Sequence, residues 1–168
     1  MLERKCPDCS ADVLTLPRDG LGPRFRAVGG SWRLLLGRGA IVAREPTDGV
    51  RTWSALEYGC HVRDVFEVFE ERIRTTLKKR KPPTFRDWDH DQAAIDGDYA
   101  NADPDQVAYA LASRAGKVAD LLDRVSGDEW DKRSTRSDGF GFTVETLARY
   151  MLHDVEHHLW DARALLDQ

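Results

Sequence analysis

Three of the five histidines lie in one short stretch near the end of the chain. His153 and His157 are four positions apart, so on a helix they project from one face about one turn apart. Two imidazoles at this spacing can bind one metal ion. The usual metalloprotease motif has a glutamate directly after the first histidine, but Asp154 stands there. The pattern therefore predicts a metal-binding pair and disfavours a hydrolytic site of that type.

A third ligand has to come from another element, and His61 is the candidate. Three neutral histidines would leave a fourth position open for water or substrate, as in catalytic zinc sites. Alternatively, His61 is an ordinary partly buried histidine and the pair lies on an exposed polar face. Tyr150 and Trp160 favour a pocket, because they share the face of the pair and would otherwise expose two large rings to water. We interpret His158, at the edge of the apolar face, as a structural or supporting residue.

Tyr58 is three positions before His61 and lies on the same flank of its helix, which makes it a further candidate for contact with a ligand. Together with Tyr150 and Trp160 it forms our predicted ligand-binding set. Asp161, one turn after His157, is placed to orient that imidazole.

The three cysteines are too few for a disulfide framework. Cys6 and Cys9 have the spacing of half a zinc site, but such a site needs four ligands and no second cysteine pair follows. Two interpretations remain open: a zinc ion completed by a histidine or aspartate from the fold, or a redox pair. Cys60 points about 100° away from His61 on a helix, so we expect it in the core.

The elements that must position these residues are helical. Apolar residues recur at spacings of three and four, and capping residues mark the starts of several helices. The predicted helices span Leu21–Arg38, Ser54–Arg80, a segment that follows the cap Asp103 and stops near Gly127, and a segment from the cap Thr143 to Leu166. Residues 84–102 form a long polar connection of the kind that often carries function.

No segment gives a convincing strand signal, so the predicted class is all-α, a four-helix bundle. We divide the chain into an N-terminal arm, residues 1–20, and the bundle, residues 21–168. The length of 168 residues fits one domain.

Composition excludes some partners. The net charge is −4 and the only basic run is residues 78–81, which argues against nucleic acid. No apolar run approaches the length of a membrane span, and the first residues have no apolar signal-peptide core. We therefore expect a cytoplasmic protein with no membrane partner.

Two segments together resemble the DinB-like (DinB/YfiT) superfamily. They are residues 53–65, around His61, and residues 142–159, around His153 and His157. The resemblance implies an up-up-down-down four-helix bundle with a three-histidine metal site, usually zinc or nickel. By position the implied ligands are His61, His153 and His157.

The resemblance also implies chemistry with a low-molecular-weight thiol. A metal that binds sulfur lowers the thiol pKa, so a thiolate nucleophile exists at neutral pH. Members of the actinobacterial type, whose arm the Cys-Pro-Asp-Cys segment resembles, imply mycothiol as the thiol and an electrophile as second substrate. The expected function is thus a metal-dependent thiol S-transferase, which acts in detoxification or isomerisation and can form a homodimer. The alternative is a non-enzymatic, metal-binding stress or partner-binding bundle.

Overall fold

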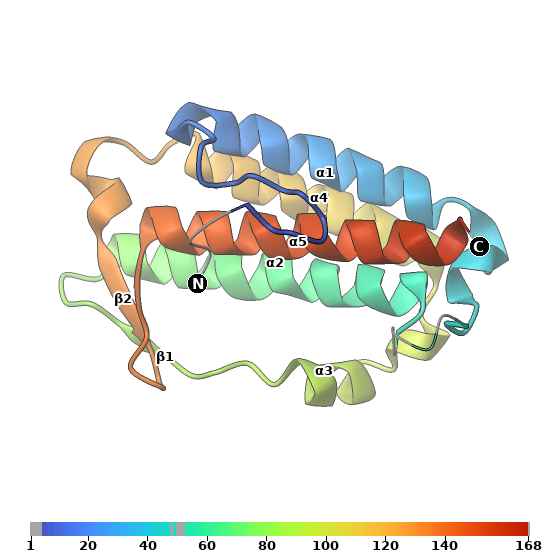
Figure 1. Ribbon diagram of the computed structural model, residues 1–168. Helices are drawn as coiled ribbons and strands as arrows, with labels where there is room; N and C mark the ends of the chain where they lie inside the picture. Colours follow the sequence, from blue (N-terminus) through green and yellow to red (C-terminus); the bar gives the residue numbers. More distant parts are fainter. Residues whose placement is uncertain (1–4, 48, 50–52, 168) are drawn as a thin grey trace.

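The computed structural model describes residues 5–47, 49 and 53–167, and long helices make up most of this part of the chain (Figure 1). Each of the predicted helices is present, with ends that differ by a few residues. Their bounds are α1 Leu21–Leu36, α2 Ala55–Lys78, α4 Pro104–Leu122 and α5 Val144–Leu166. The all-α prediction is confirmed at the level of fold class.

Local capping explains where these helices start. The Ser54 side chain accepts a hydrogen bond from the Glu57 amide, and Glu57 accepts one from the Ser54 amide, which is a complete capping box. The Asp103 side chain caps α4 by accepting a hydrogen bond from the Gln106 amide, with Pro104 in the first turn, and Thr143 caps α5 by accepting one from the Thr146 amide. These caps account for the starts of α2, α4 and α5.

The helix directions correct the implied topology. In Figure 1, α1 and α5 run one way while α2 and α4 run the other, which is up-down-down-up rather than up-up-down-down. The reason is the length of the connections: α1 turns back into α2, whereas the long segment between α2 and α4 crosses the whole bundle. As a result α2 and α5 are antiparallel neighbours.

Three glycines within α1, Gly22, Gly29 and Gly30, weaken its helix propensity, yet the helix forms because packing compensates. A Cβ atom on Gly29 would lie 2.5 Å from the Ala115 Cβ of α4. Glycine therefore allows α1 and α4 to approach closely. On its other side α1 is joined to α5, because the buried Trp32 indole donates a hydrogen bond of 3.1 Å to the Val155 carbonyl.

The connection between α2 and α4 is more structured than expected. It contains a strand, β1, a short helix, α3, and a 3-10 turn, and the connection before α5 contributes two strands and a further turn. Their bounds are β1 Thr84–Phe85, α3 His90–Asp96, η3 Tyr99–Asn101, η4 Gly127–Asp131, β2 Arg133–Arg136 and β3 Gly141–Thr143. The prediction of no strands is wrong in this detail, because strands of two to four residues carry no readable periodicity.

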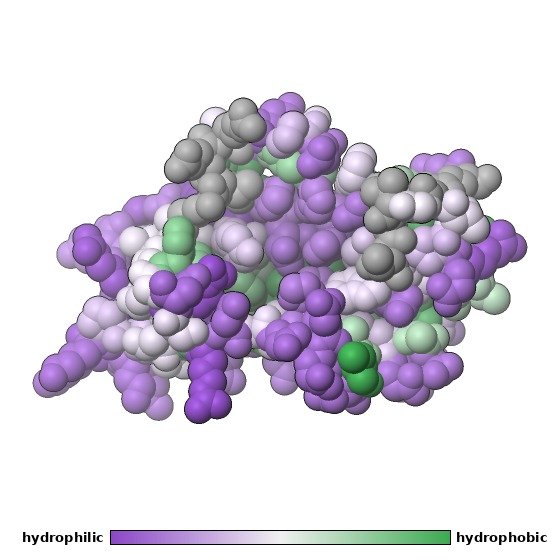
Figure 2. Space-filling model, turned by 60° about the horizontal axis from the view of Figure 1, so that its bottom comes forward, coloured by the Kyte–Doolittle hydropathy of each residue, from purple (hydrophilic) through white to green (hydrophobic). Residues whose placement is uncertain are grey.

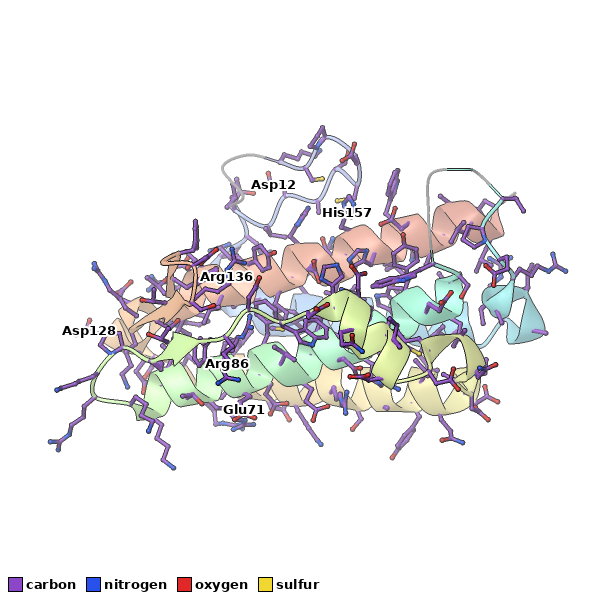
Figure 3. The ribbon with its side chains drawn as sticks, turned by 90° about the horizontal axis from the view of Figure 1, so that it is seen from below. Asp12, Glu71, Arg86, Asp128, Arg136 and His157 are labelled. Atoms are coloured by element: carbon purple, nitrogen blue, oxygen red, sulfur yellow. The ribbon has the colours of Figure 1, made fainter. Side chains whose placement is uncertain are left out.

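This small sheet has the order β1-β2-β3, with β1 parallel to β2 and β2 antiparallel to β3. Thr84 pairs with Thr135, and Ser134 pairs with Phe142. The sheet therefore holds the crossing segment beside the start of α5. Seen from below, the segment lies across the space between α2 and α5 (Figure 3).

The N-terminal arm runs beside α5 on the outside of the bundle and then enters η1, Arg18–Gly20 (Figure 1). The Arg149 guanidinium of α5 donates a hydrogen bond to the Val13 carbonyl of the arm. After α1 the chain continues through η2, Gly39–Ala43. None of the helices within the described residues has the length and apolar character needed to cross a membrane.

Candidate metal site and its pocket

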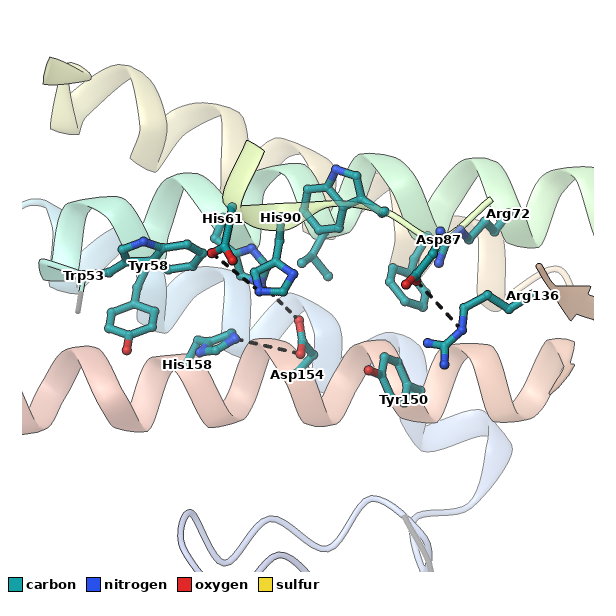
Figure 4. A pocket seen from close by; sticks show the side chains of 14 residues that line it. Trp53, Tyr58, His61, Arg72, Asp87, His90, Arg136, Tyr150, Asp154 and His158 are labelled. Carbon is teal, nitrogen blue, oxygen red and sulfur yellow. Dashed lines mark ion pairs between the residues drawn. The ribbon is translucent and has the colours of Figure 1, made fainter. Parts of the chain in front are cut away.

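A cavity of about 430 Å³ lies between α2, α5 and the crossing segment. Three groups of side chains make its walls, and Figure 4 shows their placement. They are Trp53, Tyr58, His61, Val65, Phe69 and Arg72 from α2 and the residues before it, Asp87, Trp88, His90 and Asp91 from the crossing segment, and Arg136, Tyr150, Asp154 and His158 from β2 and α5. From outside, Figure 2 shows mainly hydrophilic residues around a recess near the middle of this face.

A cluster of His61, Asp154 and His158 forms one end of the cavity. One potential ligand atom from each residue lies within 4.8 Å of the others. His61 Nε2 is 3.5 Å from Asp154 Oδ2, and His158 Nε2 is 3.8 Å from Asp154 Oδ1. The carboxylate thus stands between the two imidazoles, one oxygen toward each (Figure 4).

These separations suit a metal better than direct hydrogen bonds, which require about 2.7–3.2 Å. Nitrogen or oxygen donors about 2.0–2.1 Å from a tetrahedral zinc ion lie about 3.3–3.4 Å apart. His61 is buried, and its Nδ1 atom has no hydrogen-bond partner among the residues that the structure describes. Two imidazoles and a carboxylate are a donor set that a divalent metal binds, and the cavity leaves room for a further ligand.

The Asp154 carboxylate gives the cluster a negative charge that favours binding of a cation. Burial opposes ionisation of Asp154, but the close approach of His61 and the charges of the neighbouring histidines outweigh it and lower the pKa of Asp154. On the far side of His158, Asp161 Oδ2 lies 3.3 Å from its Nδ1 atom. A carboxylate on the second nitrogen orients the ring and raises its basicity as a ligand.

The structure separates His61 from His153 and His157, the two histidines with which the sequence analysis grouped it as a metal ligand. His61 lies close to Asp154 and His158, whereas His153 and His157 lie beside Cys6 and Cys9 of the arm. The physical reason is helix geometry: successive residues are about 100° apart, so positions 153 and 157 share one face and positions 154 and 158 share the next. The second of these faces is the one turned toward α2.

The aromatic residues of the predicted ligand-binding set also divide between two places. Tyr58 lines the cavity and stacks on His158, with ring centroids 5.1 Å apart. Tyr150 lines the same cavity farther along α5. Trp160 lies on the other side of α5, where its ring is 5.8 Å from that of His157 and borders a second cavity beside the arm.

The other end of the cavity carries two arginines. Arg72 of α2 and Arg136 of β2 both reach it, and Arg136 Nε is 3.8 Å from Asp87 Oδ1 (Figure 4). Burial lowers the pKa of Arg72, although the guanidinium stays charged at any ordinary pH. Arg72 lies eleven positions after His61 on α2, a rise of about 16.5 Å along the helix axis. The cavity is therefore elongated, with a candidate metal site at one end and two arginines at the other, of which Arg136 is paired with Asp138.

Cys60 is placed as expected. Its thiol is fully buried, and burial raises its pKa to about 12. A thiol in this state is inert as a nucleophile at neutral pH.

Comparison with known proteins places this arrangement in a family. Residues 39–162 match the DinB superfamily, about three quarters of the chain and including all three residues of the cluster. The chain belongs to the DinB superfamily. Among solved structures, YfiT from Bacillus subtilis, described as a probable metal-dependent hydrolase with an unusual four-helix bundle topology, matches at 19% identity and a TM-score of 0.77. The match covers 89% of this chain and 85% of YfiT, and it shows a shared fold. No curated protein matches.

For this DinB superfamily member, sequence reasoning missed Asp154 as a candidate ligand and underrated His158. A signal existed: Asp154 and His158 repeat the spacing of four that drew attention to His153 and His157. The wall of the cavity formed by Trp88 and His90 was partly anticipated, since the polar connection was expected to be functional. The Trp88 ring stacks on His61 at 5.3 Å and 8°, which covers the cluster from the crossing segment.

Proposed function

We propose that this chain is a metal-dependent enzyme that activates a low-molecular-weight thiol at the His61, Asp154 and His158 cluster. The observation that carries the proposal is the position of these three donors, close together at the end of a cavity large enough for a small-molecule substrate. Zinc is the expected ion, with nickel as the alternative, and mycothiol is the expected thiol.

A divalent metal held by these residues would bind the thiol sulfur and lower its pKa, so that the thiolate forms at neutral pH. Asp154 contributes the one negative charge among the ligands, and Asp161 keeps the His158 ring in place. Trp53 and Trp88 surround His61, with ring centroids 5.2 and 5.3 Å away, and limit the access of water to it. The thiol proton would be released to solvent, and the thiolate would form a carbon–sulfur bond with the electrophile as the bond from that carbon to the leaving group breaks.

The arginines support an electrophile that carries a carboxylate or another anionic group. Arg72 and Arg136 line the end of the cavity away from the cluster. An anion bound there would keep the rest of an extended substrate directed toward the cluster. Guanidinium groups suit this task because they stay charged and can bind carboxylates through two hydrogen bonds.

Metal-dependent hydrolysis is a second candidate. Two histidines and a carboxylate also form the ligand set of several zinc hydrolases, in which the metal activates water. The description of YfiT as a probable metal-dependent hydrolase agrees with this chemistry. The two candidates share the ligands and differ in the nucleophile.

The first experiment is metal analysis of the purified full chain and of His61→Ala and His158→Ala variants. His90→Ala is the matched control, because His90 lines the same cavity but lies outside the cluster. We expect the two ligand variants each to lose about one metal ion per chain relative to wild type, and His90→Ala to keep it. Unchanged metal content in both ligand variants would refute the site.

Activity assays then separate the functions. We expect consumption of a carboxylate-bearing electrophile that requires mycothiol, bacillithiol or glutathione and that is lost in His158→Ala. Cleavage of esters or amides without any thiol would support the hydrolase instead. Metal binding without turnover in either assay would contradict both and favour the non-enzymatic bundle.

A further inference from the structure

We propose that Cys6, Cys9, His153 and His157 bind a second metal ion, a structural zinc that fastens the N-terminal arm to α5. One ligand atom from each of the four residues lies within 4.8 Å of the others. This site is separate from the cavity, and the proposal holds whether or not the chain is an enzyme. Figure 3 shows the arm beside α5 near the labelled His157.

The distances are those of ligands around a shared ion. Cys6 Sγ is 3.7 Å from His157 Nδ1, and Cys9 Sγ is 3.9 Å from His153 Nε2. With zinc–sulfur and zinc–nitrogen bonds of about 2.3 and 2.0–2.1 Å at tetrahedral angles, sulfur and nitrogen lie about 3.6 Å apart. The four side chains need only small shifts to enclose a tetrahedral ion.

The arm is folded locally so that both thiols face α5. The Ser10 amide donates a 3.1 Å hydrogen bond to the Cys6 carbonyl, and the Cys6 amide donates a 3.2 Å bond to the Ala11 carbonyl. Ser10 has φ of 59°, in the left-handed region that a non-glycine residue adopts at a cost. This tight turn brings Cys6 and Cys9 to the same side of the arm, opposite the histidine pair.

The donor chemistry selects zinc and a closed site. Two thiolates and two neutral imidazoles balance a dication and are a common set for structural zinc. Four protein ligands fill a tetrahedral shell and leave no position for a substrate. The remaining nitrogen of His157, Nε2, lies 3.6 Å from Asp161 Oδ2, so a carboxylate stands where it orients this ligand as well.

Few other contacts hold the arm. Between residues 5 and 17 it forms no helix or strand, Cys6 and Val13 are its buried apolar side chains, and Ala11 and Leu16 pack partly buried against the core. So short a segment with so small an apolar contact is the kind that natural proteins fasten with a metal or a disulfide. The Arg149 hydrogen bond to Val13 anchors the arm only a few residues farther along.

The test measures metal content under reducing conditions in wild type, in the double variant Cys6→Ser/Cys9→Ser and in His157→Gln. Asp12→Asn is the matched control, since Asp12 lies in the same arm but outside the four-ligand cluster, and its carboxylate accepts a hydrogen bond from the Thr15 amide. We expect the double variant and His157→Gln each to lose about one zinc ion per chain, and Asp12→Asn to lose none. Although Cys6 is buried, neither cysteine of the arm belongs to the hydrophobic cluster at the centre of the bundle, so the double variant should fold.

Cobalt distinguishes this site from the one in the cavity. In a His61→Ala background, cobalt bound at the arm site should give thiolate-to-metal charge-transfer absorption, and the double cysteine variant should abolish it. In the same background, a chelator should expose the arm to protease within residues 5–17. If the double variant keeps all its zinc, or if cobalt gives no thiolate absorption in reduced His61→Ala protein, the proposal is wrong. Loss of zinc in the cysteine variants but not in His61→Ala would contradict only the cavity site.

Discussion

Replacing Tyr99 with phenylalanine tests how the crossing segment is held over the cavity. Tyr99, in η3, is buried at 1% exposure, and its hydroxyl donates a 2.7 Å hydrogen bond to Asp64 Oδ2 of α2. Asp64 also accepts hydrogen bonds from Arg63 and Arg114. The Trp53 ring, part of the cavity wall, lies 6.5 Å from that of Tyr99. Tyr99 therefore links the crossing segment, the cavity wall and α2.

Tyr99→Phe removes one hydrogen bond and leaves the ring packed. A hydrogen bond to a charged group contributes about 1.5–3 kcal/mol. The low end of this range applies, because Asp64 keeps its hydrogen bonds from Arg63 and Arg114 and its side chain is about a quarter exposed. We expect a loss of about 1.5 kcal/mol in unfolding free energy. For a chain of this size that lowers the melting temperature by about 3–6 °C.

The effect should depend on pH. Burial tends to raise the pKa of Asp64, but the hydrogen bonds from Arg63 and Tyr99 and the charges of Arg63 and Arg114 lower it overall. A carboxylate with a lowered folded-state pKa stabilises the fold above its unfolded-state pKa of about 3.9. That contribution is lost as the pH falls through the folded-state value. The gap between wild type and Tyr99→Phe should therefore be full at pH 7 and shrink in acid.

Urea unfolding at pH 7 and at successively lower pH measures this gap, with Asp64→Asn and the double variant completing a mutant cycle. The reasoning is refuted if Tyr99→Phe unfolds within about 0.5 kcal/mol of wild type at pH 7, the range of a neutral surface change. It is also refuted if the two substitutions are additive, or if the gap is the same in acid as at pH 7.

Three further perturbations follow from the structure. Asp161→Asn should weaken metal binding at both candidate sites by about 10–100-fold. Competition with a chromophoric chelator measures this, and weaker binding at only one site would show that the carboxylate orients only one of the two histidines. Gly29→Val should destabilise the fold by about 1–3 kcal/mol, because the new side chain overlaps Ala115; urea unfolding checks it, and an unchanged midpoint would contradict the close packing of α1 on α4. Arg72→Met should raise KM for an anionic electrophile and leave the metal content unchanged, and an unaltered KM would place the anion elsewhere.

Much of the fold was predictable because it rests on local signals. The capping box at Ser54 and the caps at Asp103 and Thr143 mark helix starts that the structure confirms. The helix directions and the small sheet were not predictable in this way, since they depend on contacts between distant segments. Thr84, for example, pairs with Thr135, fifty-one positions away.

The types of residue in the candidate site could be predicted from the sequence, but which of these residues lie together could be predicted less well. His61 and the cluster of histidines on α5 could be recognised from residue type and spacing. Which face of α5 turns toward α2 depends on packing, and a rotation of about 100° exchanges His153 and His157 for Asp154 and His158. No local pattern indicates that the arm, more than 140 positions away in sequence, lies against the first pair.

The two ligand pairs on α5 have consequences for each other. Because their spacing is the same and their offset is one residue, both can exist on one helix without competing for an ion: one faces the arm and the other faces α2. Asp161 lies close to a ring nitrogen of His157 and also to one of His158, so its position is common to both clusters. An ion at the arm would fix His157 and thereby restrict Asp161, the carboxylate that orients His158 in the cavity. A fastened arm therefore favours an ordered ligand set on the opposite side of the helix, with no direct contact between the two ions.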